Sequence, residues 1–139
     1  MVRKVSGMMK TNLKTPEYQS GACNIGGPEV RRRKISAIIG AVFSLAFYVV
    51  AFSLDASRGI RAMIFFPLMV ATVGWFQSRR KFCVVYGMRG FANFGQLGEG
   101  LQVIGSAEKS ADRVQAVKIF AQAALLAAVI SLVTTLVPA

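Results

Sequence analysis

The chain has 139 residues, of which 54% are hydrophobic and only 17% are charged, whereas a soluble domain is typically about 25% charged. Its 17 Lys and Arg against 6 Asp and Glu give a net charge of +11, a surplus that together with this hydrophobicity argues against a soluble nucleic-acid-binding protein and against a mostly disordered chain. Two cysteines are too few for a disulfide scaffold, and the lack of histidine removes the commonest general base and metal ligand. The composition predicts a small, basic integral membrane protein.

Residues 1–34 form a polar N-terminal segment, which we expect to be an irregular cytoplasmic arm. Its prolines and glycines favour turns over regular structure. One stretch stands out directly before a basic cluster, and it is either a loop leading into the first helix or a docking motif for a larger subunit: Cys23, Asn24, Ile25, Gly26 and Glu29.

Three apolar runs follow, at about 35–54, 60–77 and 116–137. The first is twenty residues without a charge, about 30 Å of helix, which matches the hydrocarbon thickness of a bilayer. The second contains Pro67, where we expect a kink, and a five-residue link joins it to the first as a tight hairpin, so residues 35–77 form one unit. The third run, within 116–139, continues a helix expected to begin near Ser106. The sequence therefore predicts an all-α membrane protein with three transmembrane helices.

Residues 78–115 connect the second and third runs and are rich in glycine and aromatic residues. Within them, 82–105 hold six of the thirteen glycines. Neither a phosphate-binding loop nor a dinucleotide fingerprint fits their spacing, so we expect no nucleotide. We expect a partly helical or irregular segment at the cytoplasmic interface, with Arg89 at the lipid phosphates.

The basic residues indicate an orientation. Eight precede the first run, two lie near the hairpin, and seven fall between the second and third runs. Because basic residues favour the cytoplasmic side, we expect the N-terminus inside and the C-terminus outside. The residues expected at the membrane surface, near anionic lipid phosphates, are Arg31, Arg32, Arg33, Lys34, Arg79, Arg80, Lys81 and Arg89.

Small residues recur at a spacing of four on the first and third runs. Such seams let helix backbones approach closely, and in lipid this packing is a main source of helix association. They either hold the three helices of this chain together or face another protein. The residues concerned are Gly40, Ser44, Ala123, Ala127 and Ser131.

The stretch 21–34 resembles small, uncharacterised bacterial integral membrane proteins in which Cys-Asn-Ile-Gly-x-x-Glu precedes an Arg-rich helix start. The resemblance implies a bacterial plasma (inner) membrane and no particular activity.

The six acidic residues form no recognisable catalytic pair, and no run has the ligands of a metal site or cofactor. We therefore expect a non-enzymatic accessory or assembly subunit of a larger membrane complex. Its partners would be other membrane subunits and anionic phospholipids, with no nucleic acid. The alternatives are a self-associating pore-forming or membrane-shaping homo-oligomer and, third, an enzyme acting on lipid.

Overall fold

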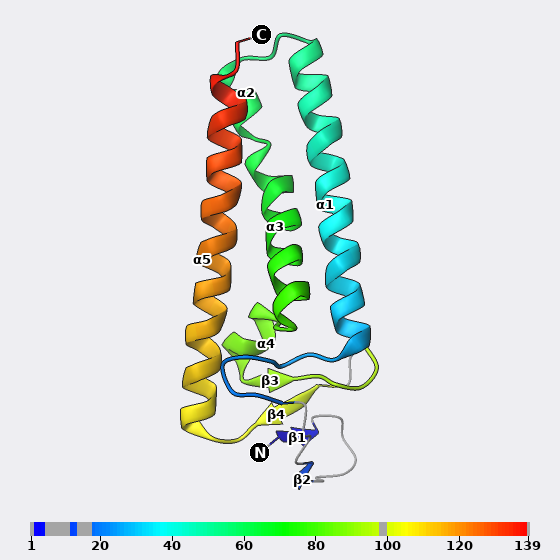
Figure 1. Ribbon diagram of the computed structural model, residues 1–139, viewed down its shortest axis with the longest axis vertical. Coiled ribbons are helices and arrows are strands. Elements are labelled where there is room, and N and C mark those ends of the chain that lie inside the picture. The colour runs from blue at the N-terminus through cyan, green and yellow to red at the C-terminus, as the bar shows by residue number, and fades with distance from the viewer. Residues whose placement is uncertain (1, 5–11, 14–17, 98–99, 139) are drawn as a thin grey trace.

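The computed structural model describes residues 2–4, 12–13, 18–97 and 100–138 (Figure 1). Three long helices run along the molecule: α1 (Gly27–Ser53), α3 (Phe65–Arg80) and α5 (Ser106–Leu136). Together with the short helix α2 (Arg58–Ala62), they provide three segments that are long and apolar enough to cross a membrane. The prediction of three membrane-spanning helices is confirmed at this level.

Helix α1 begins eight residues before the predicted span because charged turns extend it below the apolar run. Gly26 is its N-cap and Pro28 lies in its first turn, where a missing N–H costs no hydrogen bond. Glu29 places an acid in the same turn, next to the positive end of the helix dipole.

The second span is interrupted near its start, as Pro67 predicts. Helix α2 ends at Ala62 and α3 begins at Phe65. Pro67 has no N–H to offer the carbonyl of Met63, four residues earlier, and its ring crowds that carbonyl. The Met63 oxygen accepts a hydrogen bond from Phe66 N instead (3.2 Å).

Arg61 links three chain segments at the end of the molecule where a short connection joins α1 to α2. Its Nε donates to the carbonyl of Ala56 (2.9 Å), and its Nη1 donates to the carbonyl of Val137, just after α5 (2.9 Å). Its guanidinium also lies over the ring of Phe52 (5.7 Å). A cation therefore satisfies the carbonyl end of α5, which has no basic residue in its own last turn.

Helix α3 lies between α1 and α5, and it packs against both. The approach to α1 is closest at two glycines. A Cβ on Gly40 would lie 2.9 Å from the Cα of Ala71, and one on Gly74 would lie 2.8 Å from the backbone N of Ala37. Only residues without a side chain permit this spacing. Helices α1 and α5, both described over their full length, make almost no contact with each other.

Helix α5 is 31 residues long, about 46 Å, and therefore exceeds the hydrocarbon thickness by several turns. It starts at Ser106 as predicted, although its N-cap is Gly105. Asp112, Ala116 and Ile119 lie buried along its lower half. The extra turns support the folded region beneath the helices.

That region, called here the basal cap, comprises residues 18–26, α4 and a small antiparallel sheet with strand order β2-β1-β4-β3. Val2 pairs with Val103, and Phe91 pairs with Gln102. The elements are β1 (Val2–Lys4), β2 (Asn12–Leu13), α4 (Val84–Arg89), β3 (Phe91–Ala92) and β4 (Leu101–Val103).

Two expectations are corrected by the basal cap. The chain is mostly but not purely helical, because the predicted interfacial segment contributes β3 and β4 and the N-terminal segment contributes β1 and β2. Where it is described, the predicted arm is part of the folded cap: 2–4 and 12–13 form strands, and 18–26 consist of turns and isolated bridges packed against the rest of the cap. Positions 1, 5–11, 14–17, 98–99 and 139 of the predicted segments lie outside the described residues.

Candidate functional site

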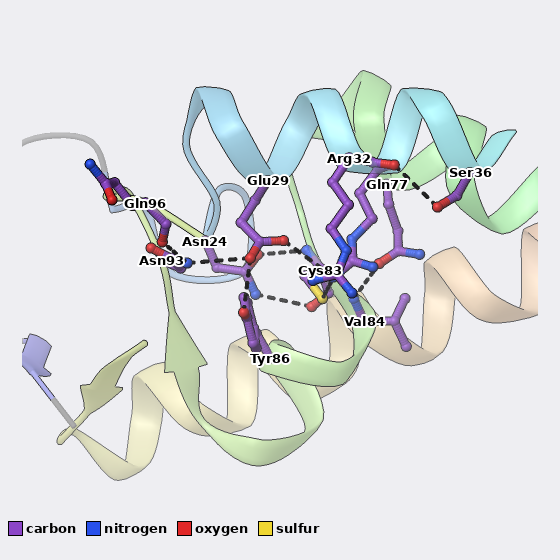
Figure 2. Close-up of polar contacts among 11 residues, drawn as sticks. Asn24, Glu29, Arg32, Ser36, Gln77, Cys83, Val84, Tyr86, Asn93 and Gln96 are labelled. Atoms are coloured by element: carbon purple, nitrogen blue, oxygen red, sulfur yellow. Dashed lines mark hydrogen bonds and ion pairs between the residues drawn. The ribbon is translucent and has the colours of Figure 1, made fainter. Parts of the chain in front are cut away.

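The centre of the basal cap is a buried polar cluster beneath the helix ends (Figure 2). Asn24 is fully buried and forms a two-way amide contact with the main chain of Cys83. Its Nδ2 donates to the Cys83 carbonyl (3.1 Å), and its Oδ1 accepts from the Cys83 N–H (2.6 Å). The Asn24 main chain also bonds in both directions, to the Lys81 carbonyl (3.1 Å) and from the Asn93 N–H (2.8 Å). One residue thus joins the α3–α4 connection to β3.

Glu29, also fully buried, is the second member of the cluster. Its Oε1 accepts hydrogen bonds from the Tyr86 hydroxyl (3.1 Å) and from Asn93 Nδ2 (3.3 Å), as Figure 2 shows. Its Oε2 lies 3.5 Å from Nη2 of Arg33, one turn further along α1. Burial, and then the neighbouring Glu29 charge, raise the pKa of Tyr86.

Arg33, which was expected at the membrane surface, has its guanidinium in this cluster. Besides Glu29, its Nη2 contacts the Sγ of Cys83 (3.0 Å). Gln77 Oε1 accepts from the N–H of Val84 and closes the same junction (3.0 Å). Since Cys83 is fully buried, its thiol is enclosed by protein in this conformation. These contacts fix the turn between α3 and α4.

A second polar contact ties the N-terminal segment to α5. The Tyr18 hydroxyl donates to Oδ2 of Asp112 (2.7 Å), and the Gly21 N–H donates to Oδ1 (2.7 Å). Asp112 is fully buried, and both of its oxygens are used. Partial burial and the hydrogen bond to Asp112 raise the pKa of Tyr18.

The predicted docking stretch therefore lies inside the protein. Asn24, Ile25 and Glu29 are 0–1% exposed, and Gly26 approaches Phe94 so closely that a Cβ would lie 2.9 Å from its Cα. Cys23 is partly exposed, with its Sγ 3.8 Å from the Ile25 carbonyl. The side chains of this stretch mostly contact the chain itself.

The predicted membrane-surface residues gather at the cap end of the molecule, because α1 begins there and α3 ends there. Arg79 and Arg80 extend their guanidinium groups over the rings of Trp75 (5.3 Å) and Phe76 (5.4 Å). Arg33 is the exception described above. The exposed members are Arg31, Arg32, Lys34, Arg79, Lys81 and Arg89.

The small residues predicted to form packing seams are all buried between helices of this chain, and they comprise Gly40, Ser44, Ala123, Ala127 and Ser131. Thr72 Oγ1 donates to the Ala123 carbonyl (3.1 Å), which joins α3 to α5. Ser131 Oγ donates to the Ala62 carbonyl (3.0 Å), which joins α5 to α2. These small residues therefore lie at contacts between helices of this chain, as one of the two alternatives expects.

Sequence reasoning missed the buried roles of Tyr86, Asn93 and Asp112. Their partners lie between 57 and 94 residues away in the chain, so no local spacing marks them. One signal was available for Asp112. It is an acid on the helix face that carries Ala116 and Ile119, where an unpaired charge would be costly to bury.

Over the described part of the chain, no three His, Cys, Asp or Glu residues come together as a metal-ligand group. No protein-family model, curated protein or solved structure matches the chain.

Proposed function

We propose that the protein is a non-enzymatic accessory or assembly subunit of a larger membrane complex in a bacterial plasma membrane. One observation carries this proposal: at most 28% of the most apolar stretch of any of the three spans is buried within the chain. Large apolar side chains such as Phe43, Leu45 and Leu125 are about 65% exposed. In a membrane this surface meets either lipid or another subunit. Because lipid tails are as apolar as these side chains, subunits associate there mainly through close packing of their helices.

The basal cap would lie on the cytoplasmic side, with the C-terminus on the other. The support is the gathering of exposed cations at the cap end, including Arg31, Arg32 and Arg89. Cations beside membrane-spanning segments favour the cytoplasmic face and attract its anionic lipids. A reporter fused after Ala139 should be active outside the cytoplasm only, and cytoplasmic activity would refute this orientation.

The cap would present a fixed surface to the partner. Its inner side chains are used in contacts within the chain, above all at Asn24, Glu29 and Asp112. A surface held by buried hydrogen bonds keeps one shape, which lowers the entropy lost on association. The N-terminal segment thereby contributes to docking by shaping the cap, while its exposed atoms make the contact.

Isolation of the tagged native chain in mild detergent tests the proposal. We expect a membrane protein in fixed stoichiometry with the chain. Asn24→Ala, which should open the cap, is expected to reduce this recovery, whereas Ser110→Ala, a change at an exposed position on α5, should not. Recovery of the free 15.0 kDa chain alone would refute the proposal.

The runner-up is a self-associating pore-forming or membrane-shaping module. The same exposed apolar surface would then contact further copies. A uniform large species from the chain expressed alone, with no second polypeptide, would favour it over the accessory subunit.

A further inference from the structure

A groove of about 960 Å³ lies between α1 and α5, with α3 as its floor. It exists because α1 and α5 both pack on α3 without closing against each other (Figure 1). Its size is at the upper end of the roughly 300–1,000 Å³ common for ligand pockets. Small and branched apolar side chains form its walls, among them Ala37, Ala41, Leu68, Ala71, Leu126 and Ile130.

The hydroxyl groups of the groove do not make it polar. Ser44 Oγ donates to the Gly40 carbonyl (2.7 Å), and the Thr72 hydroxyl lies within hydrogen-bond distance of backbone carbonyls that include those of Leu68 (2.9 Å) and Ala123 (3.1 Å). Ser78 Oγ donates to the carbonyl of Trp75 (2.8 Å). Each hydroxyl is thus bonded to a helix backbone, and the walls offer an occupant chiefly apolar contacts.

The cap end of the groove is cationic. Lys34 from α1, Arg79 from α3 and Lys81 directly after α3 line it, and no carboxylate of the described residues does. The one ion pair found among the described residues joins Arg33 to Glu29, so it leaves these three cations without an acidic partner there. A single anionic group at this end would meet all three charges.

The length of the groove matches one leaflet of a bilayer. Its lining on α1 extends from Val30 to Ser44, a rise of about 21 Å. Half of a bilayer, headgroups included, is about 20–22 Å thick. A phosphate at the cationic end would leave an acyl chain just long enough to reach the apolar end.

We propose that this groove binds one anionic phospholipid of the adjacent leaflet, with its phosphate held by Lys34, Arg79 and Lys81 and an acyl chain along the walls. The charge at one end and the apolar remainder fit an amphiphile. The site requires only that the chain lies in a membrane, so it is independent of the accessory-subunit proposal.

Native mass spectrometry of the full chain in detergent tests the headgroup. We expect one phosphatidylglycerol per chain, and weaker retention of phosphatidylcholine with the same acyl chains. The triple variant Lys34→Gln, Arg79→Gln, Lys81→Gln should weaken phosphatidylglycerol binding on the order of 100-fold. The control carries the same loss of charge at exposed positions outside the groove lining, and it should change binding only a few-fold: Arg31→Gln, Arg32→Gln, Arg89→Gln. Equal losses in both triple variants, or equal binding of the two lipids, would overturn the proposal.

A second pair of variants tests the acyl chain without changing charge. Ala41→Leu adds bulk to the groove wall and should weaken lipid binding about tenfold, while Ala128→Leu, at an exposed position on α5 outside the lining, should not. Both positions are exposed, and unchanged circular dichroism melting would confirm that both variants fold. Glycerol 3-phosphate should not compete with the lipid. Competition by this headgroup alone, or a groove occupied by a second polypeptide while no lipid is retained, would refute the proposal.

Discussion

Asn24 offers the sharpest test of the basal cap. Asn24→Ala removes the hydrogen-bond partner of the Cys83 N–H, which would then be buried and unpaired, whereas the Cys83 carbonyl keeps its hydrogen bond from the Gly87 N–H (2.9 Å). Such a group costs about 1–3 kcal/mol, so the cap should lose about 1–3 kcal/mol of stability. Because 1.4 kcal/mol corresponds to a factor of ten, the fraction of molecules with an open cap should rise about 5- to 140-fold.

The Cys83 thiol provides the assay because it is fully buried when the cap is closed. In a Cys23→Ser background, the rate of maleimide labelling in detergent reports how often the cap opens. The rate should rise by the factor given above in Asn24→Ala. Ser110→Ala, which alters an exposed position, should stay within about threefold of the parent, since surface changes usually remain within about 0.5 kcal/mol. Labelling of Asn24→Ala at the parent rate would refute the role assigned to this residue.

Three further predictions concern stability. Gly40→Ala should destabilise the α1–α3 contact by about 1–3 kcal/mol in detergent unfolding, because its Cβ would lie 2.5 Å from a backbone nitrogen of α3, whereas Gly59→Ala, with open space around it, should be neutral or slightly stabilising. Tyr18→Phe should flatten the alkaline limb of a stability–pH profile. The raised pKa of Tyr18 contributes stability that is complete below the unfolded value of about 10 and is lost as pH rises through the higher folded value. Lys81→Gly should raise the free energy of unfolding by about 1 kcal/mol, since φ is +51° there and glycine adopts this conformation without strain. The same variant should weaken phosphatidylglycerol retention, because the groove loses one of its three cations. A loss of both stability and lipid retention would contradict the role assigned to Lys81 in the groove.

The spans were predictable from sequence because hydropathy over about twenty residues is a local property. Pro67 likewise acts on a carbonyl only four residues away, and the break at Met63 follows from its covalent structure. The early start of α1 was less visible, because its first turns carry charge and belong to the cap instead of the membrane.

The basal cap was not predictable by the same means. Its strands are two or three residues long, too short to show an alternating pattern. Glycine content suggested irregular structure across 82–105, although Gly87 and Gly90 serve specific contacts. A Cβ on Gly87 would lie 2.7 Å from the ring of Phe82, and Gly90 ends α4 with φ of +75°. The buried polar side chains find partners that only the folded chain brings near.

The separation of these partners along the chain also sets the order in which they can meet during synthesis. The strand that begins at Val2 is synthesised before the first two spans, and its partner around Val103 is made only after both of them. Tyr18 is likewise made 94 residues before its partner Asp112. At about 5–20 residues per second, the N-terminal segment spends several seconds without its partners. The two parts of the cap therefore meet only when α5 has begun to be made, and closure of the cap registers that the first two spans have already been synthesised.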